Sequence, residues 1–327
     1  MKPQRVYGGM IAAAMAATIV MTGCSSGAET IQISGSATVA PITQAVATQG
    51  SFAVDVSTEG TGEGFARFCA GETVINNAST PIPGSGDDVD YVEMCAQNGV
   101  EFIELPIGLD ALSIVRNEAN TFAQDLSLEQ LAEIWGPDSE VTNWSDVDPS
   151  WPDEQIGLYG RPAGSGTFDV FTRTVNGAVG VIREDYETTN DLEELARWIA
   201  EDPHGLGFMG VGNYLPADEE YRDHITNSSV NGVAPALDEV QAGHYDVFTR
   251  PLFIYVSVTA LDDGDVVDFV EYYLDEAEQV LPRVYFYALP SEAYPLVRER
   301  LDNRTVGTLY EDSADRDVPV TELLGLN

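Results

Sequence analysis

Short β-rich stretches alternate with helical stretches along this chain, and turns rich in Gly, Ser and Thr separate them. A strand is predicted at residues 31–33 and a helix at 39–48, and the same order returns with a strand at 155–159 and a helix at 168–175. Apolar residues at every second position indicate strands, and apolar residues three and four apart indicate helices. Repeated strand–helix units of this kind predict an α/β fold with mostly parallel sheets.

The length of the chain favours two compact lobes rather than one. About 300 residues follow the N-terminal segment described next, and a typical domain has about 100–150 residues. Two apolar, β-rich stretches near residues 111–116 and 249–256 are predicted to cross between the lobes. We therefore expect residues 31–112 and 251–327 to form a discontinuous first lobe and residues 113–250 to form the second.

The N-terminal segment has the pattern of an export signal. Lys2 and Arg5 precede a small, apolar run at residues 8–20, and Cys24 follows Thr-Gly at its end. A basic start, a short apolar run and small residues before a cleavage point are typical of signal peptides. We predict a signal peptide at 1–23, lipidation of Cys24 at a lipobox-like sequence, and a tether over 24–30. The alternative is an ordinary signal peptide in which Cys24 is incidental.

Two further cysteines, Cys69 and Cys95, remain in the exported part. In an oxidising compartment such a pair usually forms a disulfide, which would stabilise the fold by about 3 kcal/mol. The alternative is two buried thiols.

The charge balance excludes several kinds of partner. The chain has 54 acidic and 15 basic residues, a net charge of −39, and its only Lys is Lys2. Long-range repulsion then argues against binding to nucleic acid or to anionic membrane surfaces. A surface this acidic indicates a saline environment, because the Debye length is only about 3 Å at 1 M salt.

Three segments combine the end of a strand, a Gly/Ser/Thr turn and the start of a helix, at residues 35–38, 60–64 and 164–167. A helix N-terminus exposes unpaired N–H groups and a partial positive charge, and glycines allow the backbone to approach an anion closely. One such turn is weak evidence, because an ordinary helix cap uses the same residue types. Three turns, distributed over both predicted lobes, favour a cleft in which helix N-termini converge on an oxyanion.

Arg161 lies three residues before Gly164, in a chain with few cations. It could donate charge-assisted hydrogen bonds to an oxyanion in this cleft, or it could form a surface ion pair with one of the many acids. A buried cage of backbone N–H groups, hydroxyls and one Arg would bind an anion in spite of the net negative charge.

The segments 35–42, 60–72, 75–82, 165–172 and 250–255 resemble the corresponding loops of the phosphate-binding proteins of ABC importers, the PstS family. The resemblance extends in order over the whole mature chain. It implies a two-lobed periplasmic-binding-protein fold of type II, with the ligand cleft between the lobes. It also implies these phosphate contacts: Ala37, Thr38, Val39, Thr61, Gly62, Ser79, Thr80, Arg161, Ser165, Gly166 and Thr167.

The chain departs from that family at three positions. Known phosphate binders carry an acidic residue at the position of Thr80, where a carboxylate accepts the proton of phosphate and repels sulfate. Val74 replaces a frequent Asp, and Ala163 leaves Arg161 without a neighbouring carboxylate. Glu63 or Asp110 could supply the missing acceptor, although each could equally be an exposed acid or a structural cap. Sulfate, molybdate or tungstate therefore remain alternative ligands.

Two other classes of protein fit the sequence less well. A secreted hydrolase would need a Gly-x-Ser-x-Gly elbow or a zinc motif, whereas His204, His224 and His244 are scattered among polar residues. The acidic runs at 87–90 and 262–265 lack EF-hand spacing. We therefore expect no catalysis, metal or cofactor. The expected protein is a monomer on the outer side of the cell membrane that delivers phosphate to an ABC permease.

Overall fold

The computed structural model describes Met1 and residues 30–210, 219–310 and 318–326. Its strands form one mixed sheet of ten strands in the order β2-β1-β3-β10-β4-β8-β6-β7, with β9 pairing with both β4 and β5. The strands are β1 (Ile31–Gly35), β2 (Val54–Val56), β3 (Ile75–Ala78), β4 (Phe102–Asn117), β5 (Asp125–Leu126), β6 (Gly157–Gly160), β7 (Glu187–Thr188), β8 (Gly205–Gly210), β9 (Ile225–Val230) and β10 (Thr249–Ser257).

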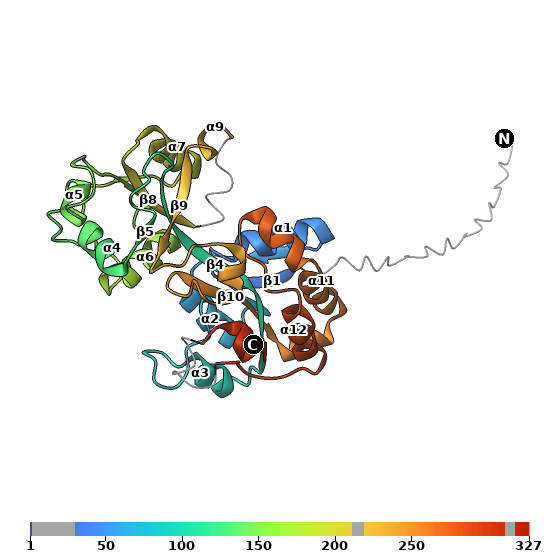
Figure 1. Cartoon of the computed structure of the whole chain (residues 1–327). Helices are drawn as coiled ribbons and strands as arrows, with labels where there is room; N and C mark the ends of the chain where they lie inside the picture. The colour runs from blue at the N-terminus through green and yellow to red at the C-terminus, as the bar shows by residue number, and fades with distance from the viewer. Residues whose placement is uncertain (2–29, 211–218, 311–317, 327) are drawn as a thin grey trace.

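Strand β4 runs through both halves of the molecule (Figure 1). Up to Ala111 it pairs with β10, and from Leu112 onward it pairs with β8 and then also with β9. The stretch predicted to cross at 111–116 is therefore the second part of one long strand that begins at Phe102. The pairing of β4 with β10 shifts register between Leu252 and Phe253, opposite Ile107, so the strand continues through Pro106 and Gly108 as a β-bulge.

The prediction of mostly parallel sheets is correct only away from the centre. Strand β1 pairs in parallel with β2 and β3, and β6 pairs in parallel with β7 and β8. The long central strands instead pair antiparallel: β10 with β3 and β4, and β4 with β8 and β9. Strands that cross between two halves in opposite directions must lie antiparallel, which explains the mixed centre.

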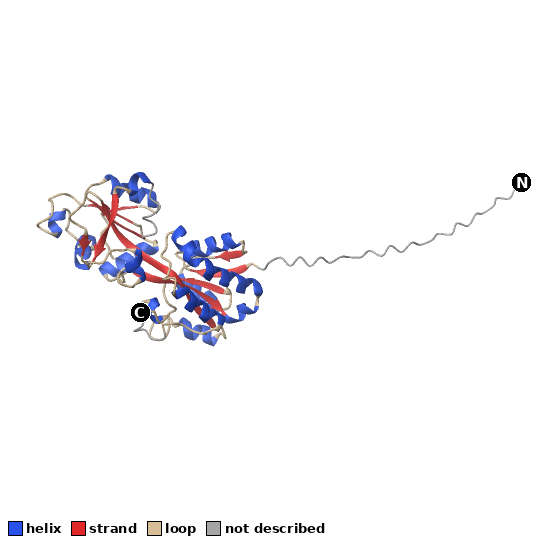
Figure 2. Cartoon of the chain, turned by 45° about the vertical axis from the view of Figure 1, so that its right-hand side comes forward, coloured by secondary structure: helices blue, strands red, loops and turns tan. Residues whose placement is uncertain are grey.

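Helices surround both halves of the sheet (Figures 1 and 2). The α-helices are α1 (Ala40–Gly50), α2 (Thr61–Cys69), α3 (Tyr91–Gln97), α4 (Leu128–Trp135), α5 (Trp144–Val147), α6 (Gly166–Asn176), α7 (Leu192–Glu201), α9 (Glu219–Arg222), α10 (Leu237–Gln241), α11 (Gly264–Val280), α12 (Ala293–Asp302) and α13 (Val320–Leu323). None of the helices described is long and apolar enough to cross a membrane.

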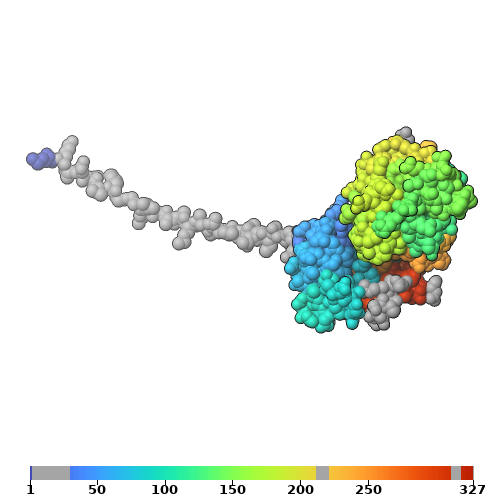
Figure 3. Space-filling view, turned by 90° about the vertical axis from the view of Figure 1, so that its left-hand side faces the viewer, coloured from blue at the N-terminus to red at the C-terminus, as the bar shows by residue number. Residues whose placement is uncertain are grey.

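The C-terminal helices return to the half that begins the chain. Helix α11 packs on α1, and α12 packs on β4 and α11. Figure 3 shows the green and yellow middle of the described chain gathered into one body beside the blue N-terminal part. The first half is therefore built from both ends of the described chain, and the second from its middle.

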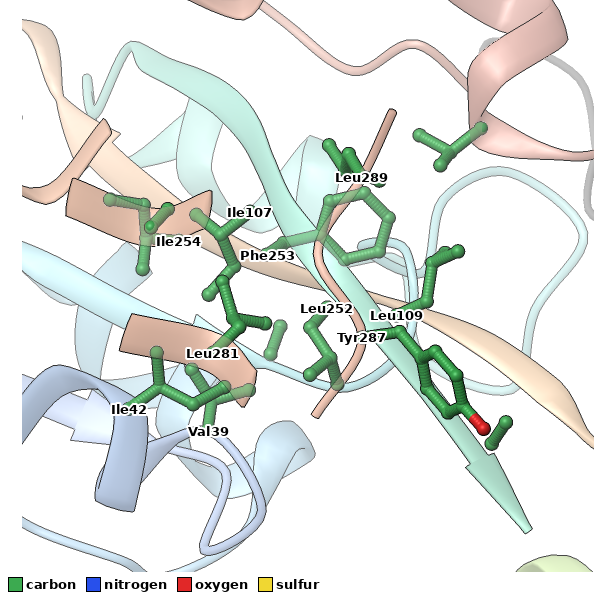
Figure 4. Close-up of a cluster of buried hydrophobic side chains, with 14 of the residues drawn as sticks. Val39, Ile42, Ile107, Leu109, Leu252, Phe253, Ile254, Leu281, Tyr287 and Leu289 are labelled. Atoms are coloured by element: carbon green, nitrogen blue, oxygen red, sulfur yellow. The ribbon is translucent and has the colours of Figure 1, made fainter. Parts of the chain in front are cut away.

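The apolar core continues beneath the start of α1 (Figure 4). Val39 and Ile42 are fully buried and lie beside Leu281, in the same cluster as Leu252 and Ile254 of β10. This packing fixes the N-terminus of α1 relative to a crossing strand.

The predicted disulfide between Cys69 and Cys95 is confirmed, with a Cα–Cα distance of 4.3 Å. It joins the C-terminal end of α2 to α3 and so holds α2 from its far end. The predicted signal peptide, the lipidated Cys24 and most of the tether lie outside the described residues.

Candidate functional site

The three Gly/Ser/Thr turns lead into helices α1, α2 and α6. Helix α2 begins at Thr61 and α6 at Gly166, so part of each predicted turn forms the first helical turn. Each helix is fixed by buried aromatic or aliphatic side chains on its inner face. In α6, for example, Phe171 stacks on Phe208 of β8 with ring centroids 4.0 Å apart, and Trp135 packs edge-on against Phe171.

None of these three helices has a hydrogen bond from a side-chain cap. The N-cap residues are Val39, Gly60 and Ser165. By contrast, Asp90 caps α3 and Asp191 caps α7 through their carboxylates. Some other described helices also begin without a side-chain cap, so this feature alone identifies no site. Together with the convergence described below, it leaves the first-turn N–H groups of α2 and α6 for an anion. In α1, by contrast, the N–H groups of Ala40 and Ile42 donate to the backbone oxygens of Ser36 and Val39.

Hydroxyl groups join the first-half turns to the loop after β3. Ser36 Oγ donates to Ser79 Oγ at 3.2 Å, and Thr61 Oγ1 lies 3.2 Å from the same Ser79 oxygen. The N–H of Ser79 also donates to Thr61 Oγ1 at 3.4 Å, and Ser36 and Ser79 are buried. The turns 35–38 and 60–64 and the loop 79–80, predicted separately, therefore meet at one hydroxyl cluster.

The second-half turn meets this region at Gly166. A methyl group built on Gly166 would lie 3.2 Å from Thr38 Oγ1 and 3.3 Å from Arg250 Nη2. Arg250 Nη2 donates to Thr38 Oγ1 at 3.3 Å. The start of α6, the turn before α1 and the crossing strand β10 are thus in contact, as the sequence predicted for the first two.

Arg161 contacts a different part of the second half. Its Nη1 donates to the backbone oxygen of Asn190 at 3.3 Å, and Nη2 lies 3.5 Å from Asn190 Oδ1. Its Nε is buried and has no hydrogen-bond partner in the described part of the chain, and burial lowers the pKa of the guanidinium. Arg161 therefore has a buried guanidinium nitrogen available for a further hydrogen bond.

The other predicted contacts lie in or beside the three turns. The Val39 side chain is fully buried, so only its backbone could face a ligand, whereas Ala37 is exposed. Gly62, Thr80, Ser165 and Thr167 are partly buried. Glu63 and Asp110 were the two candidates for the missing carboxylate acceptor. Glu63 is exposed in the first turn of α2.

Asp110 has a definite partner that the sequence did not predict. Its Oδ2 accepts hydrogen bonds from Arg250 Nε at 3.0 Å and from Arg250 Nη2 at 2.9 Å. The two residues are direct cross-strand neighbours on β4 and β10. They are 140 positions apart in the chain, so only the strand register, which the sequence did not reveal, brings them together.

The acidic runs at 87–90 and 262–265 cap helices and a turn. Asp90 and Asp263 cap α3 and α11, and Asp87 accepts a hydrogen bond from the N–H of Gly84 at 2.8 Å. Within the described residues, no group of three or more His, Cys, Asp or Glu side chains could hold a metal ion.

A separate cavity of about 360 Å³ lies on the opposite side of the crossing strand. It is lined by Thr249 and Pro251, which flank Arg250, and by Leu109, Val240 and Val320 among others. Because successive side chains of a strand point to opposite faces, this cavity and the Arg250 guanidinium lie on different faces of β10. The cavity is therefore not the anion site.

Two α/β halves that are joined by crossing strands and meet at helix N-termini define a two-lobed solute-binding fold. Residues 22–277 match the family model described as the PBP superfamily domain, and the chain belongs to this superfamily.

Curated and solved relatives agree with this assignment. Protein SphX of Synechocystis sp. is 35% identical over 308 residues, covering 92% of this chain and 90% of SphX. Phosphate-binding protein PstS of Staphylococcus saprophyticus is 27% identical over 334 residues, covering 97% of this chain and 99% of PstS. The crystal structure of a possible phosphate binding protein from Planctomyces limnophilus superposes with a TM-score of 0.73 at 31% identity, covering 85% of this chain and 99% of the other. The resemblance to PstS proteins and the two-lobed fold predicted from the loops are both confirmed.

Proposed function

We propose that this protein captures inorganic phosphate outside the cytoplasm and delivers it to an ABC import permease. The observation that carries the proposal is the meeting of the turn before α1 with the start of α6, where Gly166 and Thr38 are in contact. Helix N-termini from both halves, together with the hydroxyls of Thr38, Thr61 and Ser79, form a set of donors suited to a tetrahedral oxyanion. The PstS and Planctomyces relatives, which are named as phosphate-binding proteins, support phosphate as that oxyanion.

Binding between two lobes also supplies a signal to a permease. We assign residues 31–112 and 251–327 to one lobe and 113–250 to the other. An anion that contacts both lobes stabilises the closed arrangement, because only that arrangement makes all the contacts. The permease would then recognise the closed form. The proposed ligand contacts are Ala37, Thr38, Val39, Thr61, Gly62, Ser79, Thr80, Arg161, Ser165, Gly166 and Thr167.

The proposal includes no catalytic step, metal or cofactor. The protein is proposed to act as a monomer, held at the cell membrane by a lipid on Cys24. Replacing Cys24 by Ser tests the anchor: the variant should appear in the soluble extracytoplasmic fraction, whereas the unaltered protein sediments with membranes. A variant that stays with the membranes would contradict the anchor and leave the ligand assignment untouched.

Calorimetric titration of residues 25–327 with phosphate and then sulfate, at high salt, tests the ligand. We expect micromolar or tighter phosphate binding, and at least tenfold weaker sulfate binding. Equal affinity would make the protein a general oxyanion binder, as expected if the Thr80 hydroxyl cannot repel an anion that carries no proton. Binding of neither anion would refute the proposed function.

The matched site variant is Ser79→Ala, because the Ser79 hydroxyl contacts both Ser36 and Thr61. Its loss should weaken phosphate binding about tenfold, since the proposed hydrogen bond from the Ser79 hydroxyl to the anion is lost and a hydrogen bond to a charged group contributes about 1.5–3 kcal/mol. Ser85→Ala, at an exposed position, is the control and should bind as the unaltered protein does.

A further inference from the structure

Arg250 occupies the point where three separate parts of the chain meet. Its guanidinium contacts Thr38 in the turn before α1, and it lies beside Gly166 in the first turn of α6. Arg250 itself belongs to β10, one of the two strands that cross between the halves. A side chain in this place touches both walls of the proposed cleft and its hinge.

Asp110 holds the orientation of this guanidinium. Both the Nε and Nη2 atoms of Arg250 donate to Asp110 Oδ2, and the side chains of the two residues are 19% and 21% exposed. Two charge-assisted hydrogen bonds that converge on one carboxylate oxygen restrict the rotation of a guanidinium more than a single bond does. The Nη1 atom is left over and has no hydrogen-bond partner in the part of the chain that the structure describes.

The surrounding charges favour an anion at Nη1. The N-terminus of a helix carries roughly half a positive charge, and two such termini, those of α1 and α6, adjoin Arg250. The two termini and the Arg250 guanidinium together carry about two positive charges, and Asp110 carries one negative charge. The net local charge is therefore about +1. Thr38 accepts from Arg250, so its own hydroxyl proton remains available to donate in the same direction.

We propose that Arg250 is a direct ligand of the bound oxyanion, a second cation in the cleft besides Arg161. This inference rests on the proposed function, since it concerns the same cleft. In it, Nη1 of Arg250 donates to one oxygen of the anion, and Nη2 keeps its bonds to Thr38 and Asp110. Because the residue lies on a crossing strand, the anion binds to the hinge as well as to both lobes.

The first test compares phosphate affinities of Arg250→Gln, Arg250→Lys and Arg197→Gln by calorimetric titration. Arg197 on α7 pairs with Glu201 at the surface, so Arg197→Gln removes the same charge away from the cleft. We expect Arg250→Gln to weaken binding at least 30-fold, and Arg250→Lys to weaken it less because the charge remains. Arg197→Gln should stay within twofold of the unaltered protein.

A folded Arg250→Gln variant that binds phosphate within threefold of the unaltered protein would overturn the inference, while leaving the proposed function intact. If Arg250→Gln does not fold, a crystal structure of the unaltered protein with phosphate decides. A distance of 3.2 Å or less from an Arg250 Nη atom to a phosphate oxygen supports the inference, and a longer distance refutes it.

Should the unaltered protein bind only sulfate, the proposed function fails, and the same variants test Arg250 against sulfate. Absence of any oxyanion binding refutes both.

Discussion

Gly64 of α2 lies directly against Gly35 at the end of β1. A methyl group at position 64 would lie 2.3 Å from the Gly35 Cα, and one at position 35 would lie 2.1 Å from the backbone oxygen of Asn77. Gly35 also has a φ of +116°, which disfavours any other residue. Two of the three turns of the site therefore meet backbone to backbone, and this contact requires glycine on both sides.

Replacing Gly64 by Ala should therefore destabilise the protein by about 2–4 kcal/mol, because overpacking against backbone cannot be relieved by a side-chain rotation. The measurement is urea unfolding. Gly62→Ala in the same helix is the control, since its methyl group would meet only Tyr91 Oη at 3.5 Å. It should leave stability unchanged or raise it by up to about 1 kcal/mol, as Ala favours helix over Gly. Equal stability of the Gly64→Ala and Gly62→Ala variants would contradict the close approach.

Reduction of the disulfide between Cys69 and Cys95 should lower the free energy of unfolding by about 3 kcal/mol, because the unfolded chain then loses a loop constraint. Denaturant unfolding with and without reductant measures the difference. The double variant Cys69→Ser, Cys95→Ser should have the reduced stability in both conditions. If the reductant destabilised this double variant as much as the unaltered protein, the effect would have another origin.

Much of the fold was predictable because local signals agree with it. The helices at 39–48 and 168–175 were found to within two residues at each end, and Ser127 caps α4 as a Ser before an apolar helical repeat suggests. The disulfide followed from Cys69 and Cys95 being the two cysteines that remain besides Cys24. The helices and the cap depend on residues that are close in sequence, and the disulfide depends on the number of cysteines.

The missed elements depend on contacts between distant parts of the chain. Strand β9 has the sequence Ile-Thr-Asn-Ser-Ser-Val, with little apolar alternation. It forms because its backbone pairs antiparallel with that of β4. Pro106 and Gly108 suggested a break in β4, which a bulge opposite β10 accommodates. The pairing of Arg250 with Asp110 follows from that register, so the sequence predicted that the turns meet and did not predict that Arg250 lies among them.

The buried Glu104 should make stability depend on pH. Its carboxylate accepts hydrogen bonds from Tyr255 Oη at 2.6 Å, Thr308 Oγ1 at 2.7 Å and the N–H of Leu309 at 2.8 Å. Burial nevertheless raises the pKa of this carboxyl group above its ordinary value of 4.5, and the three donors offset only part of that effect. The folded chain therefore holds this proton more tightly than the unfolded chain, so the stability that Glu104 contributes is greatest below pH 4.5 and falls as pH rises through the folded pKa.

Glu104→Gln should remove this decline. We expect the free energy of unfolding of the unaltered protein, minus that of the variant, to decrease as the pH rises from 5 to 8. Urea unfolding at four pH values measures it, with Glu101→Gln at an exposed position as the control for removing one acid. A difference that increases with pH would mean that the three hydrogen bonds outweigh burial and that Glu104 is more acidic in the fold.

Added salt should strengthen phosphate binding, contrary to the usual behaviour of anion sites. A net charge of −39 repels an approaching anion over long range, and the Debye length falls from about 10 Å at 0.1 M salt to about 3 Å at 1 M. The donors in the cleft act at hydrogen-bond distance, where screening is weaker. We expect the phosphate Kd to fall severalfold between 0.1 and 1 M potassium glutamate, whose bulky anion competes poorly for the cleft. A Kd that rises with salt would mean that attraction by Arg161 and Arg250 exceeds the repulsion of the whole surface, so that binding depends on those two cations more than on the helix N-termini.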